Sequence, residues 1–495
     1  MARHVIRFLR QGRIVEQAGF HPRTTLLDYL RLEERSVGTK EGCAEGDCGA
    51  CTVALGRVKH GSLVYEPVNA CIALLGQVDG AEILTVEDLA QGGRLHPVQE
   101  AMVQHHGSQC GFCTPGIVMS LFTLYEQAPR PVTREAVNDA LAGNLCRCTG
   151  YRPIADAALT ACAGEPTPAS STRRAHAAAL LHELQASRDD DIVVGDDGTF
   201  FAAPASVPSL AQLYRQHPDA TLVSGATDVG LWITKGLAEL RKIIWLGRVS
   251  GLDGIQDRGD HILVGAGASL AAARPYLAAI DPDLDELMRR FGSAQVRAAG
   301  TVGGNIANGS PIGDLAPALI ALGATLHLQR GSQTRTLPLE EFFIAYRRQD
   351  RQEGEFVSCL AVPKLAEHEH LRCFKVTKRF DEDISAVMGA FKLTLSGRRI
   401  VAARLAYGGM AGVPKRARGA EEALAGASLD EPASWEPALA AIGREFQPLT
   451  DQRASAAYRA LVARNILFKA LTEIGSGDTR GTRIVGQRER VHAAE

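Results

Sequence analysis

Four cysteines in the first part of the chain limit the possible folds more than any other feature of the sequence. Cys43, Cys48 and Cys51 follow the pattern C-x4-C-x2-C, and Cys71 lies further along the chain. This spacing is typical of a plant-type [2Fe–2S] cluster. Zinc is the alternative, since four thiolates also suit it, but zinc sites favour paired C-x2-C motifs. The glycines between these cysteines also favour a loop that wraps a cluster and directs N–H groups at sulfur. We therefore predict that these four cysteines ligate an iron–sulfur cluster.

A second group of cysteines combines a C-x2-C pair with a C-x-C pair. The pairs are Cys110 with Cys113 and Cys146 with Cys148, and predicted helices adjoin both of them. On spacing alone, this group suits zinc as well as an iron–sulfur cluster. The remaining cysteines stand at apolar positions, where a cysteine usually acts as a small core residue; they are Cys162, Cys359 and Cys373.

Composition narrows the class of protein further. The first residues lack an apolar stretch followed by a cleavage site, and no run of about 18 apolar residues predicts a membrane span. Disulfides rarely persist without export, so we expect a cytoplasmic protein that uses most of its eleven cysteines for metal. With 54 basic and 56 acidic residues, the chain lacks the basic excess of nucleic-acid-binding proteins. We therefore expect neither a membrane nor a nucleic acid as a partner.

Cysteine distribution and element patterns divide the chain. Nine of the eleven cysteines precede residue 163, and a polar stretch rich in alanine, serine and proline follows them. A small α+β pattern comes first and begins with a predicted hairpin at Gln11-Gly12. Four helices that begin at proline or threonine are predicted next, at residues 97–105, 115–126, 133–141 and 153–163. Glycine-punctuated strands and helices follow, and then an antiparallel sheet with helices after it. We predict an α+β multidomain protein with domains at 1–88, 89–163, 198–368 and 369–475, a linker at 164–197 and a tail at 476–495.

Glycine turns in the second half of the chain are candidates for holding a dinucleotide. Gly265-Ala-Gly267 begins like the fingerprint G-x-G-x-x-G, but Leu270 stands where the third glycine belongs, so we interpret it as an ordinary turn. Two other segments, residues 222–229 and 301–314, could hold a pyrophosphate through backbone N–H groups in glycine-permitted turns. Glycine turns alone are a weak signal, because ordinary loops are their commoner source.

The strings around the second cysteine group carry a resemblance to a known family. Residues 109–116, QCGFCTPG, and residues 143–151, GNLCRCTGY, closely resemble the second [2Fe–2S] domain of the xanthine dehydrogenase and aldehyde oxidase family of molybdenum hydroxylases. The resemblance implies that Cys110, Cys113, Cys146 and Cys148 ligate the cluster nearest the molybdenum cofactor. It also implies that Gln109 faces the pterin of a partner. The implied folds are a β-grasp plant-type ferredoxin domain, a helical [2Fe–2S] domain, a two-part α+β FAD-binding domain and an α/β C-terminal domain.

The same family resemblance extends to the glycine-turn segments and implies an FAD site. The residues implied for FAD are Leu222, Val223, Ser224, Gly225, Ala226, Thr227, Asp228, Val229, Phe291, Thr301, Asp314 and Lys375, with Tyr346 near the isoalloxazine and nicotinamide. Two departures bear on the choice between NAD and oxygen as acceptor. The family's flavin turn often carries Asn-Thr-Glu where this chain has Ala226-Thr-Asp228, and Phe380 stands where vertebrate members carry arginine.

The resemblance covers the whole chain except the linker and the tail. The family's molybdopterin domains need several hundred further residues, so we expect a molybdenum-cofactor-binding large subunit as partner, in a dimer of heterodimers like the split bacterial xanthine dehydrogenases. The expected function is electron transfer from hypoxanthine and xanthine, oxidised to urate at molybdenum, through two [2Fe–2S] clusters and FAD to NAD. No side chain of this chain is expected to be catalytic. The alternatives are the relay of an aldehyde oxidase or another molybdenum hydroxylase, and a zinc-bound interaction protein.

Overall fold

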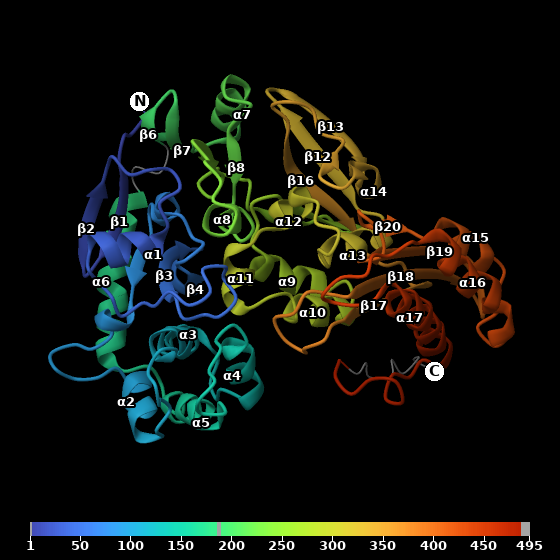
Figure 1. The fold of residues 1–495 in the computed structure, drawn as a ribbon, viewed down its shortest axis with the longest axis horizontal. Helices are drawn as coiled ribbons and strands as arrows, with labels where there is room; N and C mark the ends of the chain where they lie inside the picture. The colour runs from blue at the N-terminus through green and yellow to red at the C-terminus, as the bar shows by residue number, and fades with distance from the viewer. Residues whose placement is uncertain (1, 186–189, 487–495) are drawn as a thin grey trace. The chain divides into compact units, whose positions relative to one another are not determined.

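The computed structural model describes residues 2–185 and 190–486, which are traced from blue to red in Figure 1. The chain forms two compact units. The first contains Met1–Gly251 together with Gly292–Gly300, and the second contains Leu252–Phe291 and Thr301–Glu495. Among the described residues, no helix is both long and apolar enough to cross a membrane.

The first unit begins with a mixed sheet in the order β2-β1-β5-β3-β4. Strands β1 and β2 form an antiparallel hairpin whose two turn residues, Gln11 and Gly12, both have positive φ, as a type I′ turn requires. This confirms the predicted hairpin. Strand β1 also pairs in parallel with β5, and α1 packs its leucines against the sheet. The bounds are β1 Ile6–Arg10, β2 Arg13–Gln17, α1 Leu26–Asp28, η1 Tyr29–Glu33, β3 Thr52–Lys59, β4 Ser62–Asn69, η2 Leu75–Val78, β5 Glu82–Leu84 and η3 Val86–Asp88.

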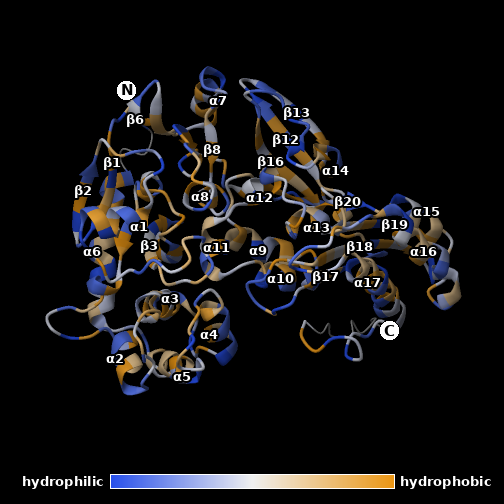
Figure 2. Ribbon diagram, viewed as in Figure 1, coloured by the Kyte–Doolittle hydropathy of each residue, from blue (hydrophilic) through white to orange (hydrophobic). Residues whose placement is uncertain are grey.

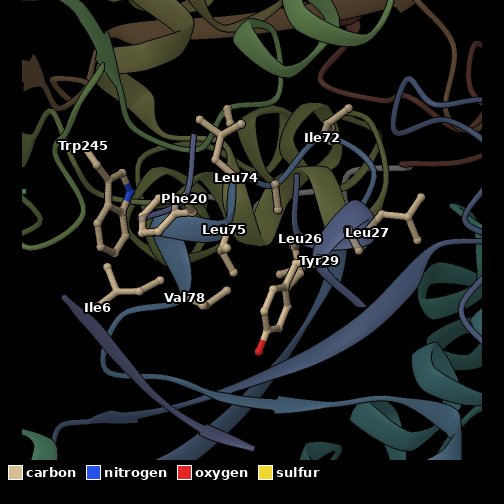
Figure 3. Packing of buried hydrophobic residues seen from close by; sticks show 14 of the residues in the cluster. Ile6, Phe20, Leu26, Leu27, Tyr29, Ile72, Leu74, Leu75, Val78 and Trp245 are labelled. Carbon is tan, nitrogen blue, oxygen red and sulfur yellow. The ribbon is translucent and has the colours of Figure 1, made fainter. Parts of the chain in front are cut away.

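A large apolar cluster joins this mixed sheet to a later part of the first unit. Figure 3 shows it from close by, with Leu26 and Leu27 of α1, Ile72 and Leu74 of the loop after Cys71, and Trp245. Burying an aromatic or aliphatic side chain of this size contributes about 2 kcal/mol. The loop after Cys71 is therefore held by core packing as well as by hydrogen bonds.

Four helices follow the mixed sheet, close to the predicted positions. They are α2 Pro97–Gln104, α3 Thr114–Gln127, α4 Arg134–Leu141 and α5 Arg152–Ala161. Each has a proline in its first turn or a threonine at its N-cap, where Thr133 accepts a hydrogen bond from the backbone N–H of Ala136. Their apolar faces form one core with Leu9, Ala54 and Leu84 of the mixed sheet.

His96 caps α2 from a buried position and gives this core a pH dependence. Its Nδ1 accepts a hydrogen bond from the N–H of Val98 at 3.3 Å. Burial, with the nearby Arg173 guanidinium, lowers the pKa of His96 to about 4. Below the ordinary pKa of 6.5, the unfolded chain therefore binds a proton at His96 that the folded chain does not. The folded state loses stability as the pH falls through this window.

Replacing His96 with asparagine should reduce this pH dependence, because asparagine can still cap α2 but does not titrate. Between pH 6.5 and 5, the loss of unfolding free energy should be smaller in the variant by about 2 kcal/mol. Urea unfolding of the intact proteins at the two pH values measures the difference. Equal pH dependence in the two proteins would show that His96 is protonated as easily in the folded state as in the unfolded one.

The predicted linker, residues 164–197, contains ordered elements in the part that the structure describes; residues 186–189 lie outside it. Helix α6, Pro168–Gln185, packs Ala177, Leu181 and Leu184 into the core of the four-helix region. Its Arg174 pairs with the buried Glu126 at 3.1 Å. The alanine- and serine-rich composition suggested a linker because α6 buries only a narrow apolar stripe. Strand β6, Ile192–Asp196, already belongs to the next sheet.

The remainder of the first unit is a four-stranded sheet in the order β6-β7-β9-β8. Strand β9 pairs in parallel with both β7 and β8. The bounds are β7 Thr199–Ala203, α7 Val207–Gln216, β8 Thr221–Val223, α8 Val229–Thr234, β9 Lys242–Trp245 and α11 Ala294–Ala299.

Among the described residues, the second unit contains two larger sheets and the two-stranded pair β14-β15. The first has the order β10-β11-β16-β12-β13 with antiparallel pairs throughout. Helix α13 has all of its eight residues buried, and Figure 2 shows its mainly hydrophobic character. The bounds are β10 Ile255–Asp257, β11 His261–Gly265, α9 Leu270–Ala278, α10 Pro282–Arg289, α12 Val302–Asn308, α13 Leu315–Leu322, β12 Thr325–Arg330, β13 Gln333–Pro338, α14 Leu339–Phe342, β14 Phe343–Ala345, β15 Arg348–Gln349 and β16 Phe356–Pro363.

The other sheet of the second unit has the order β17-β18-β19-β20 and is antiparallel, which confirms the predicted antiparallel sheet. Helices follow this sheet instead of alternating with its strands, so the two kinds of element are segregated. The bounds are β17 Glu369–Val376, β18 Val387–Ser396, β19 Arg399–Gly408, β20 Lys415–Arg416, α15 Arg418–Leu424, η4 Pro432–Trp435, α16 Glu436–Glu445 and α17 Ala456–Ser476.

The first part of the predicted tail is fixed within the second unit, whereas residues 487–495 lie outside the described residues. The buried guanidinium of Arg483 pairs with Asp283 at 2.8 Å and with Glu473 at 2.6 Å. Thr479 is also buried. The polar composition of this segment suggested a free tail because its contacts are ionic, and such contacts leave no apolar pattern in the sequence.

Candidate functional site

The structure brings together the four cysteines of the first predicted cluster. The sulfur atoms of Cys51 and Cys71 lie 3.3 Å apart, and the thiols of Cys48 and Cys71 both hydrogen-bond to Cys43. These hydrogen bonds lower the pKa of Cys43. The donating thiol of Cys71, which is also buried, has a raised pKa.

The loop around these cysteines is shaped to wrap a cluster. Ala44, Gly46 and Gly49 all have positive φ, which turns the backbone around the sulfur atoms. The backbone N–H groups of Glu45 and Cys48 point at the sulfur of Cys43, at 3.4 and 3.3 Å. Such N–H groups stabilise the negative charge of a ligating thiolate. The donor set and the backbone around it therefore fit a [2Fe–2S] cluster.

The second cysteine group lies where α3 begins and α5 begins. The thiols of Cys113 and Cys146 hydrogen-bond to each other, with Cys110 near enough to interact electrostatically. Burial is the main reason that the pKa of Cys113 is raised, to about 12. The N–H of Cys146 donates to the hydroxyl of Tyr151 at 2.8 Å, which fixes the loop before α5. Cys148 is exposed, as is Cys110.

Each of the two thiol groups supplies the four cysteines that a [2Fe–2S] cluster needs. In the part of the chain that the structure describes, no three His, Cys, Asp or Glu side chains are grouped so as to hold a metal ion. Of the cysteines predicted to be structural, Cys162 and Cys373 are buried as expected, and Cys359 is half-buried.

The turn predicted to hold the flavin pyrophosphate lies directly against the first cysteine loop, within the first unit. Its strand β8 ends at Val223, and the carbonyl oxygen of Ser224 accepts hydrogen bonds from Gln77 at 2.7 Å and Trp245 at 3.1 Å. Gly225 packs so closely on the end of α11 that a Cβ atom there would overlap the carbonyl group of Ala299. The backbone of Ala226 is left-handed, with φ of 59°.

Helix α8, which follows this turn, contacts both ends of the cysteine loop. A Cβ atom at Gly230 would lie 2.6 Å from the Cβ and carbonyl oxygen of Ile72, the residue after Cys71. The hydroxyl of Thr234 donates to the carbonyl oxygen of Ala44 at 2.6 Å. The predicted flavin turn and the predicted first cluster are therefore neighbours.

The other residues predicted for FAD belong to the second unit. Lys375 and Ser385 both donate to the buried carboxylate of Asp314, so the structure brings Lys375 and Asp314 together. The hydroxyl of Thr301 caps α12 by accepting from the N–H of Gly304 at 3.1 Å. Phe291 is half-buried at the end of this unit's first segment.

Tyr346 and Phe380, which also belong to the second unit, both have exposed side chains. Tyr346, on the turn between β14 and β15, is 60% exposed. The Arg290 guanidinium lies 4.4 Å from the centre of the Phe380 ring, and Arg289 lies 5.5 Å from it. Phe380 thus has positive charge beside it.

Several polar residues that connect the cysteine loops were not predicted from the sequence. Asn144 donates to the carbonyl oxygen of Gly49 at 3.1 Å, and Leu145 donates its N–H to the carbonyl oxygen of Cys48 at 3.0 Å. Gln295 joins them from α11. Asn144 could have been suspected, because it stands inside the string GNLCRC, but nothing in the sequence distinguishes Gln295.

Comparisons with known families match nearly the whole described chain. Residues 11–75 match the 2Fe-2S iron-sulfur cluster binding domain, and residues 85–159 match the [2Fe-2S] binding domain. Residues 197–365 match the FAD binding domain in molybdopterin dehydrogenase, and residues 372–474 match the CO dehydrogenase flavoprotein C-terminal domain.

Individual relatives agree with these matches. The chain is 32% identical to xanthine dehydrogenase of Emericella nidulans over 89% of its own length and 36% of the relative's, and 32% identical to xanthine dehydrogenase/oxidase of Rattus norvegicus over 82% and 34%. It thus spans about a third of the length of these curated relatives.

Solved structures match a little over half of this chain. A Cu,Mo-CO dehydrogenase chain superimposes with a TM-score of 0.53 at 25% identity, covering 56% of this chain and 97% of that one. A carbon monoxide dehydrogenase chain from Hydrogenophaga pseudoflava gives 0.52 at 27% identity, with coverages of 55% and 95%.

Proposed function

Since this chain belongs to the xanthine dehydrogenase family of molybdenum hydroxylases and carries their [2Fe–2S] and FAD domains, we propose that it is the family's electron relay. In this proposal, two [2Fe–2S] clusters and FAD supply the redox chemistry between a molybdenum site that oxidises hypoxanthine and xanthine to urate and the acceptor NAD. The molybdenum site belongs to a large partner subunit, in a dimer of heterodimers. The chain's own residues bind, space and shield these groups.

Contact between the cofactor loops is the observation that supports this proposal most strongly. The Leu145 N–H to Cys48 carbonyl hydrogen bond joins the second cysteine loop to the first. Ile72 beside Gly230, and Ala44 beside Thr234, join the first loop to the flavin turn. The order second cluster, first cluster, flavin is the order that a relay needs. A set of independent metal sites would require no such contacts.

The two cysteine groups differ in the exposure of their side chains, and we propose different roles for them on this basis. Cys51 and Cys71 are 1% and 2% exposed, so this side of the first site is shielded from water, whereas Cys43 and Cys48 are half-buried. Cys110 and Cys148 are exposed, and near them Phe112 and Leu145 present apolar side chains to solvent at 49% and 44% exposure. Exposed apolar side chains around a redox site are typical of a protein interface. This surface, with Gln109, is therefore where we place the molybdenum subunit.

The FAD residues have complementary roles in the proposal. The backbone from Leu222 to Val229 would hold the pyrophosphate and adenine end. Asp314 and Lys375 fix each other by a buried ion pair and would orient the ring end. Tyr346 would shield the isoalloxazine until NAD arrives, which suits its exposed position.

The oxidised substrate is the part of the proposal with the clearest rival. Carbon monoxide dehydrogenase chains are among the solved structures that match, so a relay for an aldehyde oxidase or another molybdenum hydroxylase is the second candidate. Assaying the complex of both subunits with xanthine and with aldehydes separates the two candidates. Urate formation supports the first, and carboxylate formation from an aldehyde alone supports the second.

Anaerobic titration with NADH tests the relay and its acceptor. Adding NADH to the oxidised, cofactor-loaded chain should bleach both flavin and iron–sulfur absorption, because a relay works in both directions. NADPH serves as the matched control and should act more slowly. A chain that holds iron and FAD but does not react with NADH would contradict NAD as its acceptor.

A further inference from the structure

Helix α11 and its flanking glycines occupy an unexpected place in the fold. The segment Gly292–Gly300 belongs to the first unit, although the chain on both sides of it belongs to the second. Gln295 on this helix is 1% exposed, and it lines one small pocket together with Asn69 of the first cysteine loop and Thr227 of the flavin turn. The helix therefore lies where the predicted cofactor loops meet.

The two cysteine loops are joined by a short path. The carbonyl group of Cys48 accepts the N–H of Leu145 at 3.0 Å, and Leu145 is bonded directly to Cys146. A predicted ligand of the first cluster is thus linked to a predicted ligand of the second through covalent bonds and one hydrogen bond. We name this connection the Cys48–Leu145 bridge.

Gln295 donates hydrogen bonds to a residue near each end of the Cys48–Leu145 bridge. Its side-chain N–H group points at Thr52 Oγ1, at 3.1 Å, and Asn144 Oδ1, at 3.1 Å. Ser120 Oγ lies 3.2 Å away as a third acceptor. Thr52 follows Cys51 in the first loop, and Asn144 precedes Leu145 in the second, so one amide group ties the two loops together.

The hydrogen bonds around Gln295 indicate why an amide side chain occupies this position. Thr52 donates to the carbonyl oxygen of Gly49 at 2.7 Å, and Asn144 donates to the same oxygen at 3.1 Å. Gly49 follows Cys48, so these hydrogen bonds fix the peptide next to the one that carries the bridge carbonyl. Among the described residues, Oε1 of Gln295 has no hydrogen-bond partner. A buried amide oxygen without a partner costs free energy. The hydrogen bonds that the N–H group of Gln295 donates must offset this cost.

We propose that Gln295 is a positioning residue that fixes the Cys48–Leu145 bridge, and that this bridge is the route for electrons between the two clusters. The inference rests on the relay function proposed above. One electron crosses the bridge at a time, so the Cys146 side is oxidised by one electron and the Cys48 side is reduced by one. No proton or other atom is transferred.

The test replaces Gln295 with methionine in the cofactor-loaded chain, because methionine keeps the length of glutamine and lacks its donors. Hydrogen exchange should show the Leu145 amide exchanging about tenfold faster or more, as expected for a loss of at least about 1.4 kcal/mol of protection. Electron transfer between the clusters after rapid reduction should slow by a similar factor. Iron and FAD content should stay unchanged. Gln212→Met, an exposed glutamine of α7, is the matched control and should change none of these quantities.

Unchanged exchange at Leu145 and an unchanged electron-transfer rate in Gln295→Met would overturn the proposal. If Gln295→Met loses iron, Thr52→Val decides, because it removes one acceptor of Gln295 and keeps the shape of the site. Faster Leu145 exchange in Thr52→Val supports the bridge, and wild-type exchange rejects it. Failure of the relay function itself shows separately, as a wild-type chain without iron or without reaction with NADH.

Discussion

Replacing Cys71 with serine should leave the chain with about half of its iron, because it removes a ligand of one [2Fe–2S] cluster and leaves the other intact. Cys71 is 2% exposed, with its sulfur 3.3 Å from that of Cys51 and hydrogen-bonded to Cys43. A serine oxygen is a harder and poorer ligand for this cluster than a thiolate. Iron analysis with electron paramagnetic resonance of the reduced protein measures the change.

Cys162→Ser provides the matched control for this experiment. Cys162 is also 2% exposed, but it lies in the core of the four-helix region and outside both cysteine groups. The control should retain all of its iron and lose only about 1–2 kcal/mol of stability through a buried hydroxyl group. Equal iron loss in the two variants would mean that cysteine burial, and not ligation by Cys71, determines iron content.

Replacing Gly225 with alanine should abolish most FAD binding. An added Cβ atom would overlap the backbone carbonyl group of Ala299, which cannot move without displacing α11. Overpacking against rigid backbone costs about 1–3 kcal/mol or more, which corresponds to at least about tenfold weaker FAD binding if the flavin turn is displaced. Flavin content of the purified variant and FAD titration of its flavin-free form measure the effect.

Gly443→Ala is the control for this change. Gly443 lies exposed in α16, and an added Cβ atom there would meet nothing within 4 Å. Alanine should raise helix stability there by about 0.5–1 kcal/mol without changing FAD content. If Gly225→Ala binds FAD as tightly as the wild type, the turn from Leu222 to Val229 does not hold the flavin.

Local patterns predicted much of the fold. The Gln11-Gly12 turn, the prolines and threonine that begin α2 to α5, and the strands around residues 374–406 all act over a few residues, so the sequence displays them directly. Cysteine spacing identified the two thiol groups for the same reason, since a metal site limits the spacing of its ligands. Glycine turns gave a weaker signal, because many ordinary loops contain them.

Long-range contacts could not be predicted in this way. Gln295 reaches Thr52 across 243 positions of sequence, and no local pattern distinguishes it from any other helical glutamine. Helix α6 falls within the predicted linker, because its few buried residues, which are serine, alanine and leucine, are scattered among polar ones. Arg483 likewise belongs to a polar segment, and its two ion pairs fix that segment in place. In each case, tertiary contacts outweigh local composition.

The most direct test of the relay is cofactor analysis of the intact chain purified without oxygen. The account predicts about four iron atoms, about four acid-labile sulfides and one FAD per chain. The reduced protein should show two distinct [2Fe–2S] signals by electron paramagnetic resonance. Zinc in place of iron, with no flavin, would contradict the assignment of both cysteine groups and of the flavin turn.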